Sequence, residues 1–116
     1  MNQDLDRLQD ILDAIDKIER YSSKGRELFD SDELVQTWMI HHIQIIGEAA
    51  RRISDELKVR HANIPWSQVI GMRNILVHNY FGVDLEEVWS TAMGDIPDLK
   101  RKIEAALQEL NKNLKT

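Results

Sequence analysis

The sequence predicts an all-α domain, a small up-and-down bundle of four to five helices. Apolar residues recur at steps of three and four along most of the chain, which places them on one face of a helix. The alternating apolar and polar pattern of a half-buried strand is not convincing anywhere. Both prolines stand near plausible helix starts or kinks. Because 116 residues supply one core only, we expect residues 1–116 to form a single domain.

The first helix is predicted in the N-terminal segment, and Ser22 to Gly25 should form its end and a loop. Gly25 can adopt the left-handed backbone conformation that ends many helices. The apolar stripe of this helix consists of Leu5, Leu8, Leu12, Ile15 and Ile18.

The second helix is predicted to begin at Asp30 or Ser31, since Asp30 and Glu33 have the spacing of a capping box. Its apolar positions continue to Leu57 and form a wide stripe, as in a central helix or a helix at a subunit contact. Gly47 and the two alanines after it are small enough to let another helix approach closely.

A third helix is predicted from Trp66 to about Val77, with Pro65 at its first position, where the missing amide hydrogen does no harm. Asn79 and Gly82 indicate where the chain leaves this helix.

Asp84 and Glu87 predict the start of the last helical region. Gly94 and Pro97 predict a kink or short break, after which helical spacing resumes. Residues 111–116 are expected to be a frayed tail.

Composition excludes several classes of protein. Without cysteine the chain has neither a disulfide framework nor a thiolate metal site, which is compatible with a reducing cytoplasm. The start, Met1 to Asp6, is acidic and unlike a signal peptide. No apolar run approaches the ~20 residues that cross a bilayer. We therefore expect a cytoplasmic protein that does not enter the membrane.

The formal net charge of −5 argues against a protein that holds nucleic acid through overall charge. A local basic cleft remains compatible with this charge. Its candidate residues are Arg51, Arg52, Lys58, Arg60 and His61.

The usual metal and nucleophile motifs are missing. No histidine has an acidic residue three positions before it, and the zinc-protease pattern is absent. His41 and His42 are adjacent, so they face different directions on a helix; we expect one near the surface and the other capping or packing. A nucleophile elbow and a glycine-rich phosphate loop are also missing. The sequence predicts neither a metal nor a cofactor.

Arg73, Asn74, His78 and Tyr80 are the candidate functional residues, because here polar groups interrupt an apolar run. An arginine grips phosphate through parallel hydrogen bonds, and a histidine exchanges protons near neutral pH. Arg73 and His78 are separated by ~140° around a helix and ~7.5 Å along it, so they do not share one stripe. Spacing alone also allows a structural interpretation, in which Arg73 forms a salt bridge, His78 caps a helix and Tyr80 packs.

These residues resemble the signature of the HEPN family, and the extension to Tyr80 is similar to that of the HepT-like toxins. Their motif is arginine, four residues, histidine, any residue and tyrosine, matched here from Arg73 to Tyr80. Other segments resemble that group in the same order: residues 45–50, 64–66, 71–74 and 80–84.

The resemblance implies a dimeric, metal-independent ribonuclease that is the toxin of a type VII-like toxin–antitoxin pair. Its partner would be an MNT-type nucleotidyltransferase antitoxin that attaches AMP to Tyr80, and transfer RNA is a possible substrate. By position, Arg73 and His78 would be catalytic and Asn74 would support them. Two alternatives from other classes stay open: a non-catalytic helical partner of a nucleotidyltransferase, and a plain dimeric interaction module.

The chemistry favours a dimer independently of the family. Cleavage needs a base for the ribose 2′-hydroxyl, an acid for the leaving 5′-oxygen and positive charge near the phosphorane. One histidine does not readily serve on both sides of the phosphate. Two copies of His78 and Arg73 around a two-fold axis would supply these groups.

Overall fold

The structure is a computed structural model that describes residues 2–74 and 84–114, and it confirms the all-α fold class. Every regular element in these ranges is helical. The elements are α1 (Asn2–Ser22), α2 (Arg26–Ser31), α3 (Glu33–Arg51), α4 (Asp55–Arg60), α5 (Trp66–Gly71), the 3₁₀ turn η1 (Met72–Asn74), α6 (Leu85–Ser90), the π-helical segment η2 (Thr91–Asp95) and α7 (Ile96–Leu114).

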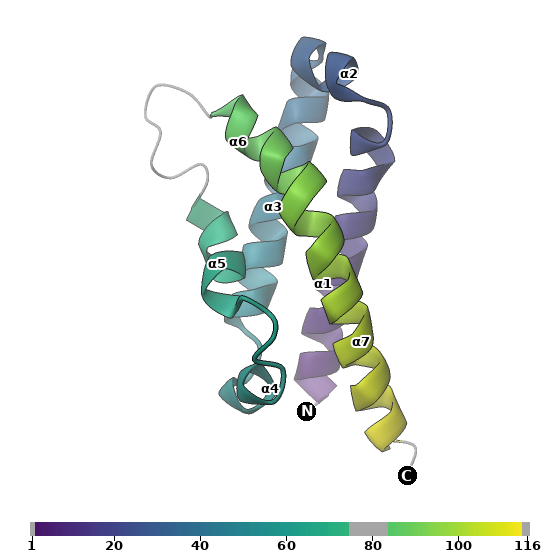
Figure 1. Cartoon of the computed structure of the whole chain (residues 1–116), viewed down its shortest axis with the longest axis vertical. Coiled ribbons are helices and arrows are strands. Elements are labelled where there is room, and N and C mark those ends of the chain that lie inside the picture. The colour runs from purple at the N-terminus through teal and green to yellow at the C-terminus, as the bar shows by residue number, and fades with distance from the viewer. Residues whose placement is uncertain (1, 75–83, 115–116) are drawn as a thin grey trace.

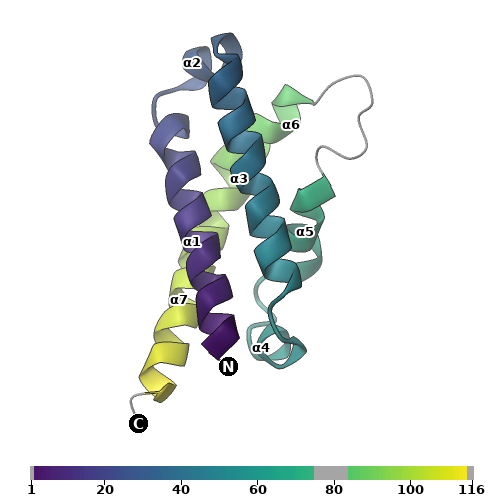
Figure 2. The ribbon, with the colours of Figure 1, turned by 180° about the vertical axis from the view of Figure 1, so that it is seen from behind.

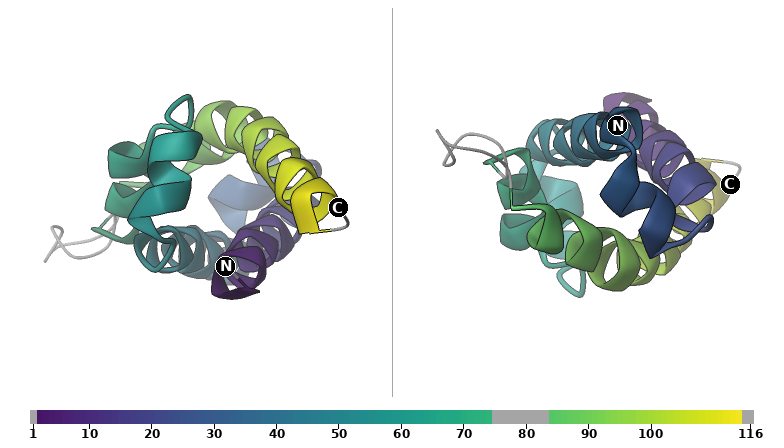
Figure 3. Two further views of the ribbon diagram at one scale, coloured as in Figure 1. Left: turned by 90° about the horizontal axis from the view of Figure 1, so that it is seen from below. Right: turned by 90° about the horizontal axis from the view of Figure 1, so that it is seen from above.

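The helices form an elongated up-and-down bundle of 49 × 28 × 20 Å. Helix α1 runs up, α3 returns beside it, α5 runs up again, and α6, η2 and α7 descend together (Figure 1). The start of α1 and the end of α7 therefore lie at the same end of the bundle. Helices α1 and α3 lie side by side on the face turned toward the viewer in Figure 2. Seen along the bundle, α1, α3, α5 and α7 surround one centre (Figure 3).

One apolar core fills that centre. The predicted stripe of α1 contributes Leu8, Ile15 and Ile18, all fully buried, whereas Leu5 and Leu12 are partly buried at its edge. The remaining fully buried large side chains come from α1, α2, α3, α5, α7 and the segment before α5. They are Ile11, Phe29, Met39, Ile43, Ile46, Ile64, Val69, Ile96 and Ile103.

The predicted start of the second long helix was wrong by two to three residues. Helix α3 begins at Glu33, and the side chain of Asp32 caps it by accepting hydrogen bonds from the amides of Leu34 (2.9 Å) and Val35 (3.4 Å). Asp30 belongs to α2 instead. Its carboxylate accepts a hydrogen bond from Nε of Arg26 at 3.0 Å and is not a cap.

The predicted continuation of that helix to Leu57 was also wrong, because α3 ends at Arg51 and α4 begins after Ser54. Ser54 caps α4 by accepting from the amide of Leu57. The buried carboxylate of Asp4 accepts hydrogen bonds from the amide (2.9 Å) and Oγ (2.6 Å) of Ser54. The start of α1 therefore fixes the break between α3 and α4.

Helix α5 begins at Trp66, so Pro65 is the residue before the helix and not its first residue. Helix α5 ends at Gly71 and tightens into η1, which holds Arg73 and Asn74. The predicted extension to Val77, and the exit at Asn79 and Gly82, lie outside the described residues.

The last helical region confirms the predicted cap and break. The carboxylate of Asp84 accepts a hydrogen bond from the amide of Glu87 at 3.2 Å. The predicted interruption near Gly94 takes the form of the π-helical segment η2. Buried positions are four apart across it, at Val88, Ala92 and Ile96, and then alternate between three and four apart. The predicted tail was wrong for residues 111–114, which belong to α7, while residues 115–116 lie outside the described residues.

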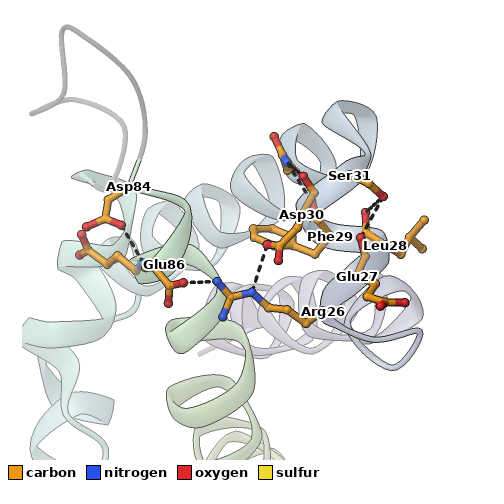
Figure 4. A network of polar contacts seen from close by, with 10 residues as sticks. Arg26, Glu27, Leu28, Phe29, Asp30, Ser31, Asp84 and Glu86 are labelled. Carbon is orange, nitrogen blue, oxygen red and sulfur yellow. Dashed lines mark hydrogen bonds and ion pairs between the residues drawn. The ribbon is translucent and has the colours of Figure 1, made fainter.

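Arg26 ties α2 to α6 (Figure 4). Its guanidinium forms ion pairs with Asp30 and with Glu86 in the first turn of α6, and it lies 5.8 Å from the ring centroid of Trp89. The ring of Phe29 packs against the same tryptophan at 5.2 Å between centroids. These contacts fix the point where the chain enters α6. In residues 2–74 and 84–114, no helix has the length and apolar character that crossing a membrane requires.

Candidate functional site

The backbone of Arg73 packs directly against α3 at Gly47. A Cβ atom on residue 47 would lie only 2.6 Å from the backbone nitrogen of Arg73 and 2.9 Å from its Cβ. Such distances are far inside van der Waals contact, so the approach requires glycine here. The prediction that small residues of α3 admit a close neighbour is confirmed at this position. It sets where Arg73 stands along α3.

The side chain of Arg73 is held loosely by Glu48. Nη1 of Arg73 donates to Oε1 of Glu48 at 3.4 Å, while Oε2 of the same carboxylate accepts from Nε of Arg51, also at 3.4 Å. The side chains of Arg73 and Glu48 are 38% and 46% exposed, so water screens this pair and it contributes little to stability. A guanidinium has five N–H donors, and only one of those of Arg73 has a partner among the described residues.

An open hollow of about 400 Å³ lies beside Arg73. Its lining consists of Gln44, Glu48, Arg73 and Asn74. The guanidinium and the two amides can all donate hydrogen bonds, and Glu48 is the single carboxylate of this lining. A planar guanidinium with neighbouring amide donors suits a phosphate group. The hollow can therefore hold a phosphate against Arg73.

The structure thus brings together two of the four predicted site residues, Arg73 and Asn74. The other two, His78 and Tyr80, lie outside the described residues. Sequence reasoning missed Gln44 and Glu48 as members of the site. The signal that could have found them is their spacing of four on α3, which places both on one face beside Gly47.

The adjacent histidines on α3 behave as predicted. His41 is exposed, whereas His42 is buried and its ring packs against Trp38 with 4.5 Å between centroids. Nδ1 of His42 donates to the carbonyl of Trp38 at 2.7 Å. Burial lowers the pKa of His42, and the backbone hydrogen bond offsets this only in part. His42 is therefore a neutral packing residue.

Two of the predicted basic residues, Arg51 and His61, pair with different carboxylates. Arg51 pairs with Glu48, and Nε2 of His61 lies 3.8 Å from a carboxylate oxygen of Glu109. Arg52 lines a hollow between α1 and α3. Within residues 2–74 and 84–114, no three histidine, aspartate or glutamate side chains are placed to share a metal ion. Metal independence itself stays a prediction.

Comparison with known proteins agrees with the motif. Residues 11–106 match the HepT-like family, described as "Ribonuclease HepT-like". The chain is 42% identical over 100 residues to a "Probable ribonuclease HepT" of Thermococcus cleftensis, which covers 85% of this chain and 91% of that protein. It is 34% identical over 92 residues to a "Putative RNase" of Caldanaerobacter subterraneus, covering 79% of this chain and 82% of the relative.

A third relative is longer. The chain is 39% identical over 107 residues to a "Gamma-glutamylcyclotransferase and putative RNase" of Methanocaldococcus jannaschii, which covers 91% of this chain but 48% of that protein. The chain spans about half the length of this relative. No solved structure matches. The extent of the family match and the identities to these relatives show that the chain belongs to the ribonuclease HepT-like family.

Proposed function

We propose that this protein is a metal-independent endoribonuclease in which Arg73 binds the scissile phosphate and His78 transfers protons. One observation carries the proposal. Arg73, the first residue of the Arg-x4-His motif, is fixed on α3 by the contact with Gly47 and lines a hollow with Gln44 and Asn74. The family match and the relatives named as ribonucleases support it.

Arg73 has the chemistry for the phosphate position. It stays charged at every physiological pH, and its parallel N–H groups match two oxygens of a phosphodiester. The pair with Glu48 is long and partly exposed, so a phosphate can displace the carboxylate at small cost. Asn74 adds an amide donor at the same hollow. Together they stabilise the negative charge that increases as the 2′-oxygen attacks phosphorus.

His78 supplies the proton transfers in this proposal, from both protomers of a homodimer. One imidazole removes the proton of the 2′-hydroxyl, and the 2′-oxygen forms a bond to phosphorus. The bond from phosphorus to the 5′-oxygen breaks, and the imidazolium of the second protomer protonates that oxygen. The products are a 2′,3′-cyclic phosphate and a 5′-hydroxyl. A two-fold axis near α5 and η1 would place both copies at one phosphate.

The test is RNA cleavage in the absence of added metal, with EDTA present and the termini of the products identified. Arg73→Ala should lower kcat roughly 10²–10³-fold, as when one transition-state donor is removed. His78→Ala should lower it by roughly 10²–10⁴-fold. Arg73→Lys keeps the charge but loses the paired hydrogen bonds, so it should restore activity only in part. Arg101→Ala is the matched control, because Arg101 is 74% exposed on α7.

Equal cleavage by all four variants would show that a contaminating nuclease is responsible. A 3′-phosphate formed without a cyclic intermediate would contradict attack by the 2′-hydroxyl. A wild-type protein that stays monomeric while cleaving RNA would refute the division of proton transfers between two protomers.

We further propose that the protein is the toxin of a toxin–antitoxin pair, with transfer RNA as a substrate, and that a nucleotidyltransferase inactivates it by attaching AMP to Tyr80. AMP would bring bulk and negative charge close to Arg73 in sequence and would repel RNA. Mass spectrometry after co-expression with such an enzyme should find one added AMP, absent from Tyr80→Phe. Growth arrest that requires Arg73 and His78 would separate a toxin from a non-catalytic partner of the nucleotidyltransferase.

A further inference from the structure

A second hollow, of about 300 Å³, lies between α1 and α3. It shares Gln44 and Glu48 with the lining of the hollow at Arg73, so the two hollows adjoin at these side chains and form one surface that extends from η1 across α3 to α1. We call it the α3 groove. Helices α1 and α3 lie side by side on this face (Figure 2). The part of the groove between α1 and α3 has a polar lining of Arg7, Asp10, His41, Gln44, Glu48 and Arg52.

The groove follows a single stripe of α3. His41, Gln44, Glu48 and Arg52 follow one another at steps of three and four, which keeps their side chains on the same face of a helix. From His41 to Arg52 the stripe is ~16 Å long. Arg73 lies across from Glu48, within this length. The groove is therefore longer than a single phosphate group needs.

The carboxylates of the groove already have cationic partners. Asp10 accepts from Nη1 of Arg7 at 3.0 Å, and Glu48 is shared by Arg51 and Arg73. Within residues 2–74 and 84–114, the side chains of His41, Gln44 and Arg52 have neither a hydrogen-bond nor an ion-pair partner. The groups left to meet a ligand are thus hydrogen-bond donors and positive charge, in a chain whose formal net charge is −5.

We propose that the α3 groove binds the single-stranded RNA that continues from the phosphate held by Arg73. This inference rests on the proposed function and extends it to the substrate. Arg52 binds a backbone phosphate of the strand, and Gln44 and His41 bind sugar or base edges. Arg52, Gln44 and His41 present positive charge and hydrogen-bond donors to the occupant, which favours an RNA strand over a protein partner.

The first experiment measures binding of a fluorescent 2′-O-methyl RNA of roughly 12 nucleotides, a length within the range of single-strand sites. This probe lacks the attacking hydroxyl, so binding is measured without cleavage. Arg52→Ala should raise Kd roughly tenfold, the effect of one lost charge-assisted hydrogen bond. It should also reduce the slope of log K against log salt by ~0.7, the value for one phosphate on a single strand. Gln44→Ala should raise Kd without changing the slope, because the amide is uncharged.

Arg101→Ala is the matched control, since it removes the same charge from α7. It should leave both Kd and the salt slope unchanged. If Arg52→Ala and Arg101→Ala change Kd and the salt slope equally, RNA binding depends on the overall charge of the protein and not on the groove, and the inference is overturned. Sedimentation showing that Arg52→Ala dissociates a dimer would place a second copy of this chain in the groove, and would equally overturn it.

Cleavage kinetics separate this inference from the proposed function. For a long RNA, Arg52→Ala should raise KM roughly tenfold, whereas cleavage of a dinucleotide, too short to reach the groove, should stay unchanged. Unchanged kinetics on the long RNA would refute the groove and leave the ribonuclease intact. If the wild-type protein cleaves no RNA, but binds the probe more tightly than Arg52→Ala does, the proposed function is refuted and the groove is supported.

Discussion

Replacing Gly47 by alanine perturbs the position of Arg73 without touching its side chain. The new methyl group would meet the backbone nitrogen of Arg73 at 2.6 Å, where an ordinary contact needs about 3.4 Å. A relative movement of about 0.8 Å is therefore required. The obstructing atoms include the backbone of η1, so a rotamer change does not relieve the clash.

Two opposing contributions decide the effect of Gly47→Ala on stability. Alanine in the middle of a helix is favoured over glycine by ~0.5–1 kcal/mol. Overpacking against a rigid neighbour costs about 1–3 kcal/mol. The clash should win, with a net loss of roughly 1–2 kcal/mol in the free energy of unfolding. RNA cleavage should fall more steeply, roughly 10²-fold, because a displacement approaching 1 Å is enough to misalign a catalytic group.

Urea unfolding and single-turnover cleavage measure the two effects separately. Gly71→Ala is the matched control, because Gly71 ends α5 and a Cβ there meets nothing within 4 Å. That variant should be as stable as the wild type or slightly more stable, and equally active. If Gly47→Ala and Gly71→Ala unfold at the same urea concentration and cleave at the same rate, η1 does not pack against α3 as described.

Three further predictions concern polar groups. Glu48→Gln removes the negative charge that a phosphate must displace from Arg73, so steady-state kinetics should show a lower KM for RNA; a higher KM would contradict this. Burial holds the pKa of His42 below the ordinary histidine value. As the pH falls through about 6.5, the unfolded state therefore binds more protons than the folded state, and the free energy of unfolding should decline. Urea titrations between about pH 8 and pH 5 should show a shallower decline for His42→Gln, and identical declines would argue against a buried neutral His42. Asp4→Ala leaves both donors of Ser54 unsatisfied and should lower the free energy of unfolding by about 1–3 kcal/mol, whereas a neutral effect would mean that water replaces the carboxylate.

The sequence predicted the parts of the fold that depend on local pattern. The apolar stripe of α1, the loop at Gly25 and the cap at Asp84 each follow from neighbouring residues, and the structure has them where expected. The errors arose where a distant residue decides. The break between α3 and α4 at Ser54 depends on Asp4, which lies fifty positions earlier in the sequence. Asp30 has the spacing of a cap, but its carboxylate pairs with Arg26, which also pairs with Glu86 of the distant α6, and Asp32 caps α3 instead.

The same limit applied to the site. The motif identified Arg73 and Asn74 from their immediate neighbours. Glu48 and Gln44 are more than twenty positions away in sequence, and only the packing of η1 on α3 brings them to Arg73. Gly47 was recognised as small, but the sequence does not say which segment would use the space. His78 and Tyr80 stay predictions from the motif, because they lie outside the described residues.

The π-helical turn at η2 acts as a phase adjustment for the rest of the chain. Its extra residue lets Val88 and Ala92 keep facing the same way as Ile96, so α6 and α7 present one continuous dry side. If the turn rewound to a regular helix with all of its residues kept, everything after it would rotate by roughly 90°. The buried isoleucines of α7 would swing toward water, although no core residue had been altered, and excising one residue of the turn, such as Gly94, would bring them back to the core.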